Sequence, residues 1–62
     1  MVYYINGNKY MIKHYKLGYV IEEHKSYFDG KFYSDSGYRI YCDNMMEVRE
    51  ALTELNGGVD IW

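Results

Sequence analysis

Apolar and polar side chains alternate along most of the chain before residue 42, and a period of two residues is typical of β-strands. All nine tyrosines lie in this part, where their rings suit a half-buried pleated surface. Short segments rich in Gly, Asn, Asp and Ser separate the alternating runs and are typical of turns. We therefore expect four strands, at Val2–Ile5, Tyr10–Tyr15, Tyr19–Phe28 and Tyr38–Cys42, with strand pairing that resumes at Lys31–Tyr33 after the third of them.

The segment Asn6–Asn8 predicts the first hairpin, because these residues tolerate the positive φ that a tight turn requires. If Gly7 and Asn8 form the turn, Ile5 pairs with Tyr10. Tyr3 then pairs with Ile12, and both pairs join an aromatic to a β-branched side chain, which stabilises a hairpin.

Three further breaks divide the chain. Lys16–Gly18 is interpreted as a turn, and residues 29–30 (Asp-Gly) predict a second tight hairpin that places Tyr27 opposite Phe32. Ser34–Gly37 is interpreted as a break before the last strand. In that strand we expect one alternating set to face the core: Tyr38, Ile40 and Cys42.

Helical spacing replaces the alternation after residue 43. Asn44 can cap the start of a helix, and Glu47 follows at the spacing of a capping box. Gly57 and Gly58 end it. Its apolar side is Met45, Val48, Ala51, Leu52 and Leu55.

These elements predict one α+β domain over residues 1–62, with a four-stranded antiparallel sheet (2–42), a C-terminal helix (44–56) and an apolar tail (59–62). A chain this short buries only roughly 60% of its surface. Cys42 is the single cysteine, so no internal disulfide can add stability. We therefore expect a homodimer formed through the helix and tail, with these interface residues: Val48, Leu52, Leu55, Ile61 and Trp62.

The net charge of −2 is unevenly distributed. Residues 1–34 carry five Lys and three carboxylates, a balance of +2, whereas residues 44–62 carry one Arg and four carboxylates, a balance of −3. The first residues lack a basic start and a long apolar run, so we expect a cytoplasmic protein without a membrane partner.

Lysine and tyrosine interleave along the predicted sheet, and a basic surface with aromatic rings is how proteins hold single-stranded nucleic acid. The DNA-binding candidates are Lys9, Lys13, Tyr15, Lys25, Tyr27 and Lys31. The alternative is that the rings belong to the core and the lysines to the solvated face of ordinary strands.

Clustered carboxylates can hold a divalent metal such as Mg²⁺ for DNA nicking. The catalytic candidates are Glu22, Glu23, Asp29 and Asp35, although their spacing marks no site. His14 and His24 could meet across neighbouring strands, but two histidines without further ligands make a poor metal site. No metal site is identified, and no other cofactor is expected.

The stretch from Tyr19 to Asn56 resembles the positive cofactor four family of transcriptional coactivators. Tyr19–Phe28 is similar to that family's long strand and Asp29–Phe32 to its turn, Gly37–Tyr41 to its last strand and Asn44–Asn56 to its helix. The resemblance implies a dimer that binds single-stranded or melted DNA on the sheet. The family tends to have a proline and basic residues where this chain has Ser-Asp-Ser, and the acidic net charge also weakens the expected DNA affinity.

Small phage-derived anti-CRISPR proteins that nick or relax supercoiled DNA are similar to the same fold. The resemblance therefore implies a DNA-directed accessory protein of a phage or mobile element, acting as a DNA-binding protein or as a metal-dependent nickase. A second hypothesis stays open: a protein-binding inhibitor or adaptor that contacts a host factor through its Tyr-rich sheet.

Overall fold

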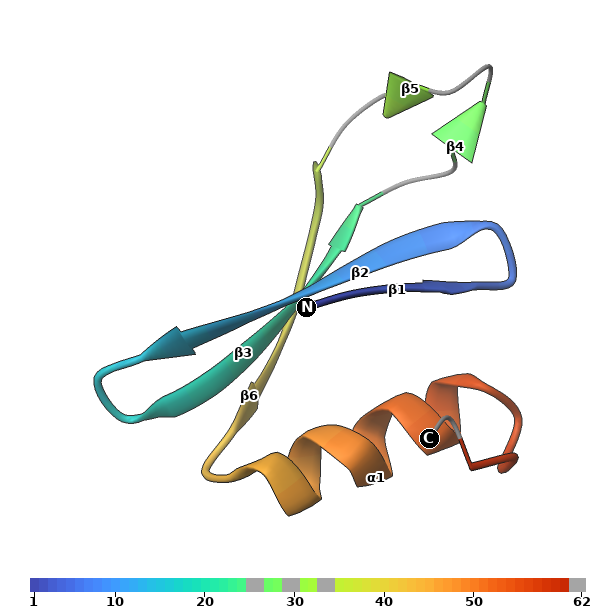
Figure 1. The fold of residues 1–62 in the computed structure, drawn as a ribbon. Helices are drawn as coiled ribbons and strands as arrows, with labels where there is room; N and C mark the ends of the chain where they lie inside the picture. Colours follow the sequence, from blue (N-terminus) through green and yellow to red (C-terminus); the bar gives the residue numbers. More distant parts are fainter. Residues whose placement is uncertain (25–26, 29–30, 33–34, 61–62) are drawn as a thin grey trace.

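The structure, a computed structural model, describes residues 1–24, 27–28, 31–32 and 35–60, with side chains described for 1–24 and 37–60. Its main sheet has the order β1-β2-β3-β6 and is antiparallel throughout (Figure 1). The bounds of its strands are Val2–Ile5 (β1), Asn8–Tyr15 (β2), Gly18–His24 (β3) and Asp35–Cys42 (β6). A C-terminal helix, α1 (Met45–Leu55), follows, so the predicted α+β class with four strands and one helix is confirmed.

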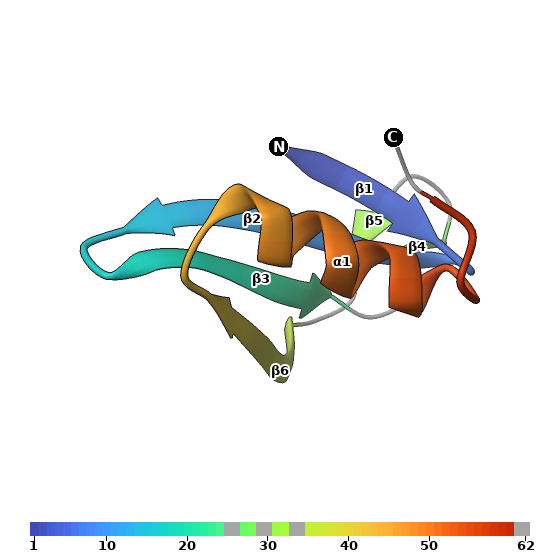
Figure 2. The same ribbon diagram turned by 90° about the horizontal axis from the view of Figure 1, so that it is seen from below.

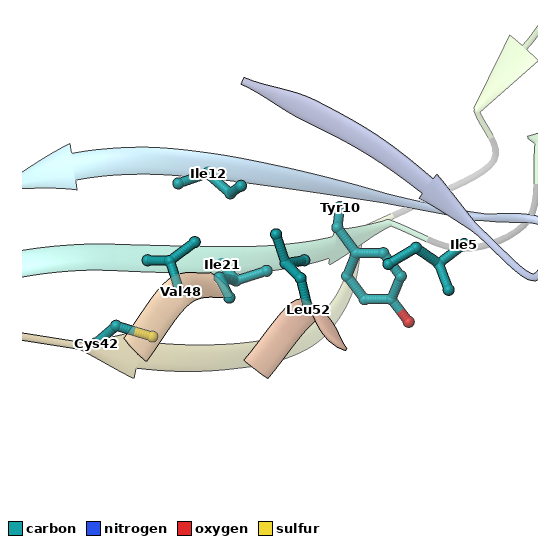
Figure 3. Packing of buried hydrophobic residues seen from close by; sticks show 7 residues of the cluster. All are labelled: Ile5, Tyr10, Ile12, Ile21, Cys42, Val48 and Leu52. Atoms are coloured by element: carbon teal, nitrogen blue, oxygen red, sulfur yellow. The ribbon is translucent and has the colours of Figure 1, made fainter. Parts of the chain in front are cut away.

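The helix lies over one face of this sheet, with β1 on one side and β6 on the other (Figure 2). The core forms between them (Figure 3), because alternate residues of each strand meet the apolar side of α1. Ile21, Val48 and Leu52 are its most completely buried side chains. Around them pack Ile5, Tyr10, Ile12 and Cys42. Among the residues that the structure describes, no helix is long and apolar enough to cross a membrane.

The first hairpin differs from its predicted register by two residues. Ile5 pairs with Asn8 and Tyr3 with Tyr10, so the turn consists of Asn6 and Gly7. Both turn residues have a positive φ, 51° and 83°, which fits the tight turn that Asn-Gly favours. A shift of two residues leaves every side chain on its predicted face, because strand side chains alternate with the same period.

The predicted long strand 19–28 is wrong, because β3 ends at His24. Residues Tyr27–Phe28 (β4) pair instead with Lys31–Phe32 (β5) in a separate two-stranded ladder, which confirms that Tyr27 lies opposite Phe32. Phe28 pairs there with Lys31, as the predicted Asp-Gly turn requires.

The predicted break at residues 34–37 is also wrong in part, because β6 begins at Asp35. Glu22 pairs with Arg39 and His24 with Asp35, so β6 advances four residues where β3 advances two. Gly37 lies within this irregular stretch with a φ of 81°, a conformation that glycine adopts without steric cost. The turn-like composition of this segment therefore forms a bulge within a strand.

The predicted helix caps are confirmed. The Asn44 side chain accepts a hydrogen bond from the Glu47 backbone N–H at 3.0 Å, and the Glu47 carboxylate accepts from the Asp43 N–H at 2.9 Å. At the other end, the Gly58 N–H donates to the Thr53 carbonyl at 2.9 Å, while both terminal glycines have positive φ values.

Two of the residues predicted at a dimer interface, Val48 and Leu52, are 0% exposed and pack in the protomer's own core. Leu55 is half-buried, and the last two residues of the predicted interface, 61–62, lie outside the described residues. In the tail, Asp60 forms an ion pair with Arg49 of α1. Homodimerisation stays a prediction.

Candidate binding surface on the open face of the sheet

The side of the sheet opposite α1 is called the open face here. It is formed by the residues of each strand that alternate with the core residues, and the strand register arranges them in rows. The first row is Tyr4, Lys9 and His24; the second is Val2, Met11, Glu22 and Arg39; the third is Lys13, Val20 and Tyr41. Because these residues come from all four strands, the surface exists only in the folded sheet.

Glu22 lies at the centre of the open face among positively charged groups. Its carboxylate is 3.1 Å from Lys13 Nζ and 3.5 Å from Arg39 Nε, and its side chain is only 14% exposed. The His24 Nε2 atom lies 3.7 Å from the same carboxylate. One carboxylate therefore holds two cations in fixed positions at the middle of the sheet.

The two cations differ in what they can still offer to a ligand. Arg39 is 27% exposed and also donates from Nη1 to the Tyr38 carbonyl at 3.3 Å. Lys13 is 55% exposed, and an ammonium has three donors, of which one reaches Glu22. Lys13 is thus better placed than Arg39 to bind an anion from solution.

Aromatic rings border the charged centre. The Tyr15 and Tyr41 rings meet edge to face, with centroids 5.9 Å apart and planes at 75°, and Tyr41 is 66% exposed. Val20 pairs with Tyr41 and Lys13 in the same row and is buried, although it lies outside the main core cluster. At this end of the open face, Val20 and the two tyrosine rings therefore form an apolar surface next to Lys13.

The fold separates charge between its two sides. The three cations of the main sheet whose side chains are described, Lys9, Lys13 and Arg39, lie on the open face, where Glu22 supplies the one carboxylate among the described side chains. The opposite side carries the carboxylates of α1 and its tail, together with that of Glu23. The sequence shows this imbalance along the chain, and the fold converts it into an imbalance between faces.

The predicted DNA-binding residues are brought together in part. Lys9, Lys13 and Tyr15 alternate along β2 and share the open face. Lys25 lies outside the described residues, and the side chains of Tyr27 and Lys31 are likewise not described. Sequence reasoning missed Arg39, Tyr41 and Tyr4 as members of this surface, although the alternation in the last strand was a signal for the first two.

The four catalytic candidates are not brought together among the described side chains. Glu22 and Glu23 are neighbours in one strand and point to opposite faces, where Glu23 accepts a 2.7 Å hydrogen bond from the Tyr10 hydroxyl. Residue 29 and the side chain of residue 35 are outside the described part. In that part, no three His, Cys, Asp or Glu side chains are grouped to hold a metal ion.

The two histidines do not meet. His14 pairs with Tyr19 near the β2–β3 turn and stacks on its ring with centroids 4.8 Å apart. His24 pairs with Lys9 at the other end of the same two strands. On the helix side of the sheet, burial raises the pKa of Cys42, and burial together with the hydrogen bond to Glu23 raises the pKa of Tyr10.

Comparison of the chain with protein-family models, with curated proteins and with solved structures finds no match.

Proposed function

We propose that the chain is a DNA-directed accessory protein that binds single-stranded or locally melted DNA on the open face of its sheet. Lys13, Lys9 and Arg39 interact with phosphates, while Tyr41 and Tyr4 offer rings on which bases stack. Both rings are well exposed, at 66% and 60%, so stacking requires no rearrangement of the core.

The single observation that carries this proposal is the separation of charge between faces. A polyanion is attracted to the side on which, among the described side chains, Lys9, Lys13 and Arg39 face the single carboxylate of Glu22, and it is repelled by the acidic side of α1. The separation therefore orients the strand even though the net charge of the chain is −2.

Glu22 limits the affinity that this surface supports. Its carboxylate neutralises part of the charge of Lys13 and Arg39, so we expect weak binding that is sensitive to salt. Glu22 also holds the Lys13 and Arg39 side chains in place, so these side chains lose less conformational freedom when a phosphate binds.

The test is fluorescence anisotropy with a labelled oligothymidine at low salt, compared with a blunt duplex of the same length. Tyr41→Ala is expected to weaken binding of the single strand by roughly 1–3 kcal/mol, the usual value of one stacked base. Tyr38→Ala is the matched control, because Tyr38 lies on the same strand and is 49% exposed on the opposite face. Equal losses in both variants, or tighter binding of the duplex, would refute the proposal.

A protein target is the alternative, and salt separates the two. Tyrosine-rich protein interfaces depend on packing and respond much less to ionic strength than phosphate contacts do. A ligand that is captured equally at low and high salt through Tyr4 and Tyr41 would therefore favour the inhibitor or adaptor hypothesis.

Nicking and an anti-CRISPR-like role in a phage or mobile element stay predictions, since the described carboxylates form no common site. Incubation of supercoiled plasmid with the protein, with magnesium or with a chelator, tests the activity. Open circles formed only with magnesium would support nicking and justify individual substitution of the four carboxylates, whereas a retarded but intact plasmid would restrict the function to binding.

A further inference from the structure

A groove of about 540 Å³ lies between β6 and α1, on the helix side of the sheet. Its lining residues are Tyr38, Ile40, Ala51, Glu54 and Leu55. Two come from alternate positions of an edge strand and three from one side of the helix, so the groove lies between these two elements. It is separate from the open face, because Tyr38 and Ile40 point to the other side of the sheet.

The groove is lined mainly by apolar side chains, with one carboxylate on its helical side. Tyr38 is 49% exposed, and Ile40, Ala51 and Leu55 are half-buried hydrophobic residues packed on the edge of the core. Glu54 is the charged residue that lines the groove. The cation of the helix, Arg49, belongs to another side and pairs with Asp60.

The apolar lining and the Glu54 carboxylate together determine which class of ligand fits the groove. Nucleic acid is disfavoured because its phosphates would face the Glu54 carboxylate and an otherwise apolar lining. A two-fold contact with a second copy would bring the Glu54 carboxylates of both copies together, and like charges at an interface destabilise it. A chain segment with apolar and cationic side chains satisfies both the apolar lining and the carboxylate.

We propose that this groove binds an extended peptide segment of a partner protein, with an apolar side chain on Tyr38, Ile40 and Leu55 and a neighbouring Lys or Arg against Glu54. The volume is ample for such side chains, since pockets that enclose ligands span roughly 300–1,000 Å³. The segment runs along β6, the last strand in the order of the sheet, as peptides do when they dock beside a sheet edge. This site is independent of DNA binding on the open face.

The experiment uses the full chain and three fluorescent peptides as long as β6, measured by anisotropy. The first alternates Val and Lys, the second alternates Val and Glu, and the third alternates Ser and Lys. The Val-Lys peptide is expected to bind, and the other two to bind at least about tenfold more weakly, because one lacks the cation and the other the apolar anchor.

Three variants locate the site on the protein. Glu54→Lys is expected to weaken the Val-Lys peptide by about tenfold and to strengthen the Val-Glu peptide. Glu50→Lys makes the same charge change on an exposed residue of α1 that does not line the groove, and it should change either affinity less than about twofold. Ala51→Met fills the groove without changing the charge and with only a small loss of helix propensity, and it should abolish peptide binding while the melting temperature stays near that of the parent chain.

Three outcomes would contradict peptide binding in the groove. Equal effects of the two charge reversals would mean that the peptide responds only to net charge. Absence of Val-Lys binding up to about 1 mM would overturn the proposal. A dimeric mass in light scattering that becomes monomeric in Ala51→Met would show that a second copy occupies the groove, and would overturn it as well.

Discussion

The salt dependence of DNA binding tests the open face most directly. Three described cations, Lys9, Lys13 and Arg39, lie within reach of one strand. Each phosphate neutralised on a single strand contributes about 0.7 to the slope of log affinity against log salt, so the expected slope is about −2. The affinity should then fall about 20-fold between about 50 and 200 mM salt.

Removal of one cation should change this slope by a known amount. Lys13→Gln is expected to reduce the magnitude of the slope, from about −2 to about −1.4, so that the affinity falls only about sevenfold over the same salt range. Glu22→Gln should strengthen binding, because it releases the two cations from their carboxylate. The assay is anisotropy of a labelled oligothymidine at a series of potassium chloride concentrations.

Lys16→Gln is the matched control. Lys16 is an exposed residue of the β2–β3 turn, so its loss changes the net charge equally without removing a cation from the open face. If Lys16→Gln reduces the slope as much as Lys13→Gln does, binding follows overall charge and our placement of the surface is wrong. A parent slope near zero would refute phosphate binding altogether.

Three predictions concern the fold. Leu52→Ala should lower the free energy of unfolding in urea by about 2–5 kcal/mol, because the residue is fully buried; an unchanged midpoint would contradict the described core. Gly18→Ala should cost more than about 1 kcal/mol, since the added Cβ overlaps the Cys42 carbonyl and the φ of 148° disfavours other residues; a neutral effect would mean that the β2–β3 turn relaxes easily. Tyr10→Phe should lower the free energy of unfolding by about 1 kcal/mol, because it removes the hydrogen bond to Glu23. The stability of this variant should also fall less steeply than that of the parent chain at alkaline pH. The folded state raises the pKa of Tyr10 above 10.0, so the stability that this shift contributes is complete below that pH and is lost as pH rises through the folded pKa. If the unfolding free energies of parent and variant run parallel above pH 10, the hydroxyl is not buried as described.

Much of the local structure could be predicted because its causes are local. The helix bounds follow from the Asn44 side chain, which caps its own chain, and from the glycines that end the helix. The faces of β2 and of residues 38–42 follow from alternation, which holds even though the first hairpin pairs two residues away from the predicted register. The same alternation places Lys13 on the side of the sheet opposite Ile12.

Long-range pairing decided the rest. Glu22 meets Arg39 only because β3 and β6 are neighbours in the sheet, and residues 17 positions apart give no periodic signal. The end of β3 at His24 and the bulge at Gly37 depend on how two strands of unequal length fit together. The sequence by itself determined the elements, their faces and the uneven charge, since capping and alternation act within a few residues. The tertiary structure decided the ion cluster, the separate β4–β5 ladder and the groove beside α1, because each depends on segments that meet only after folding.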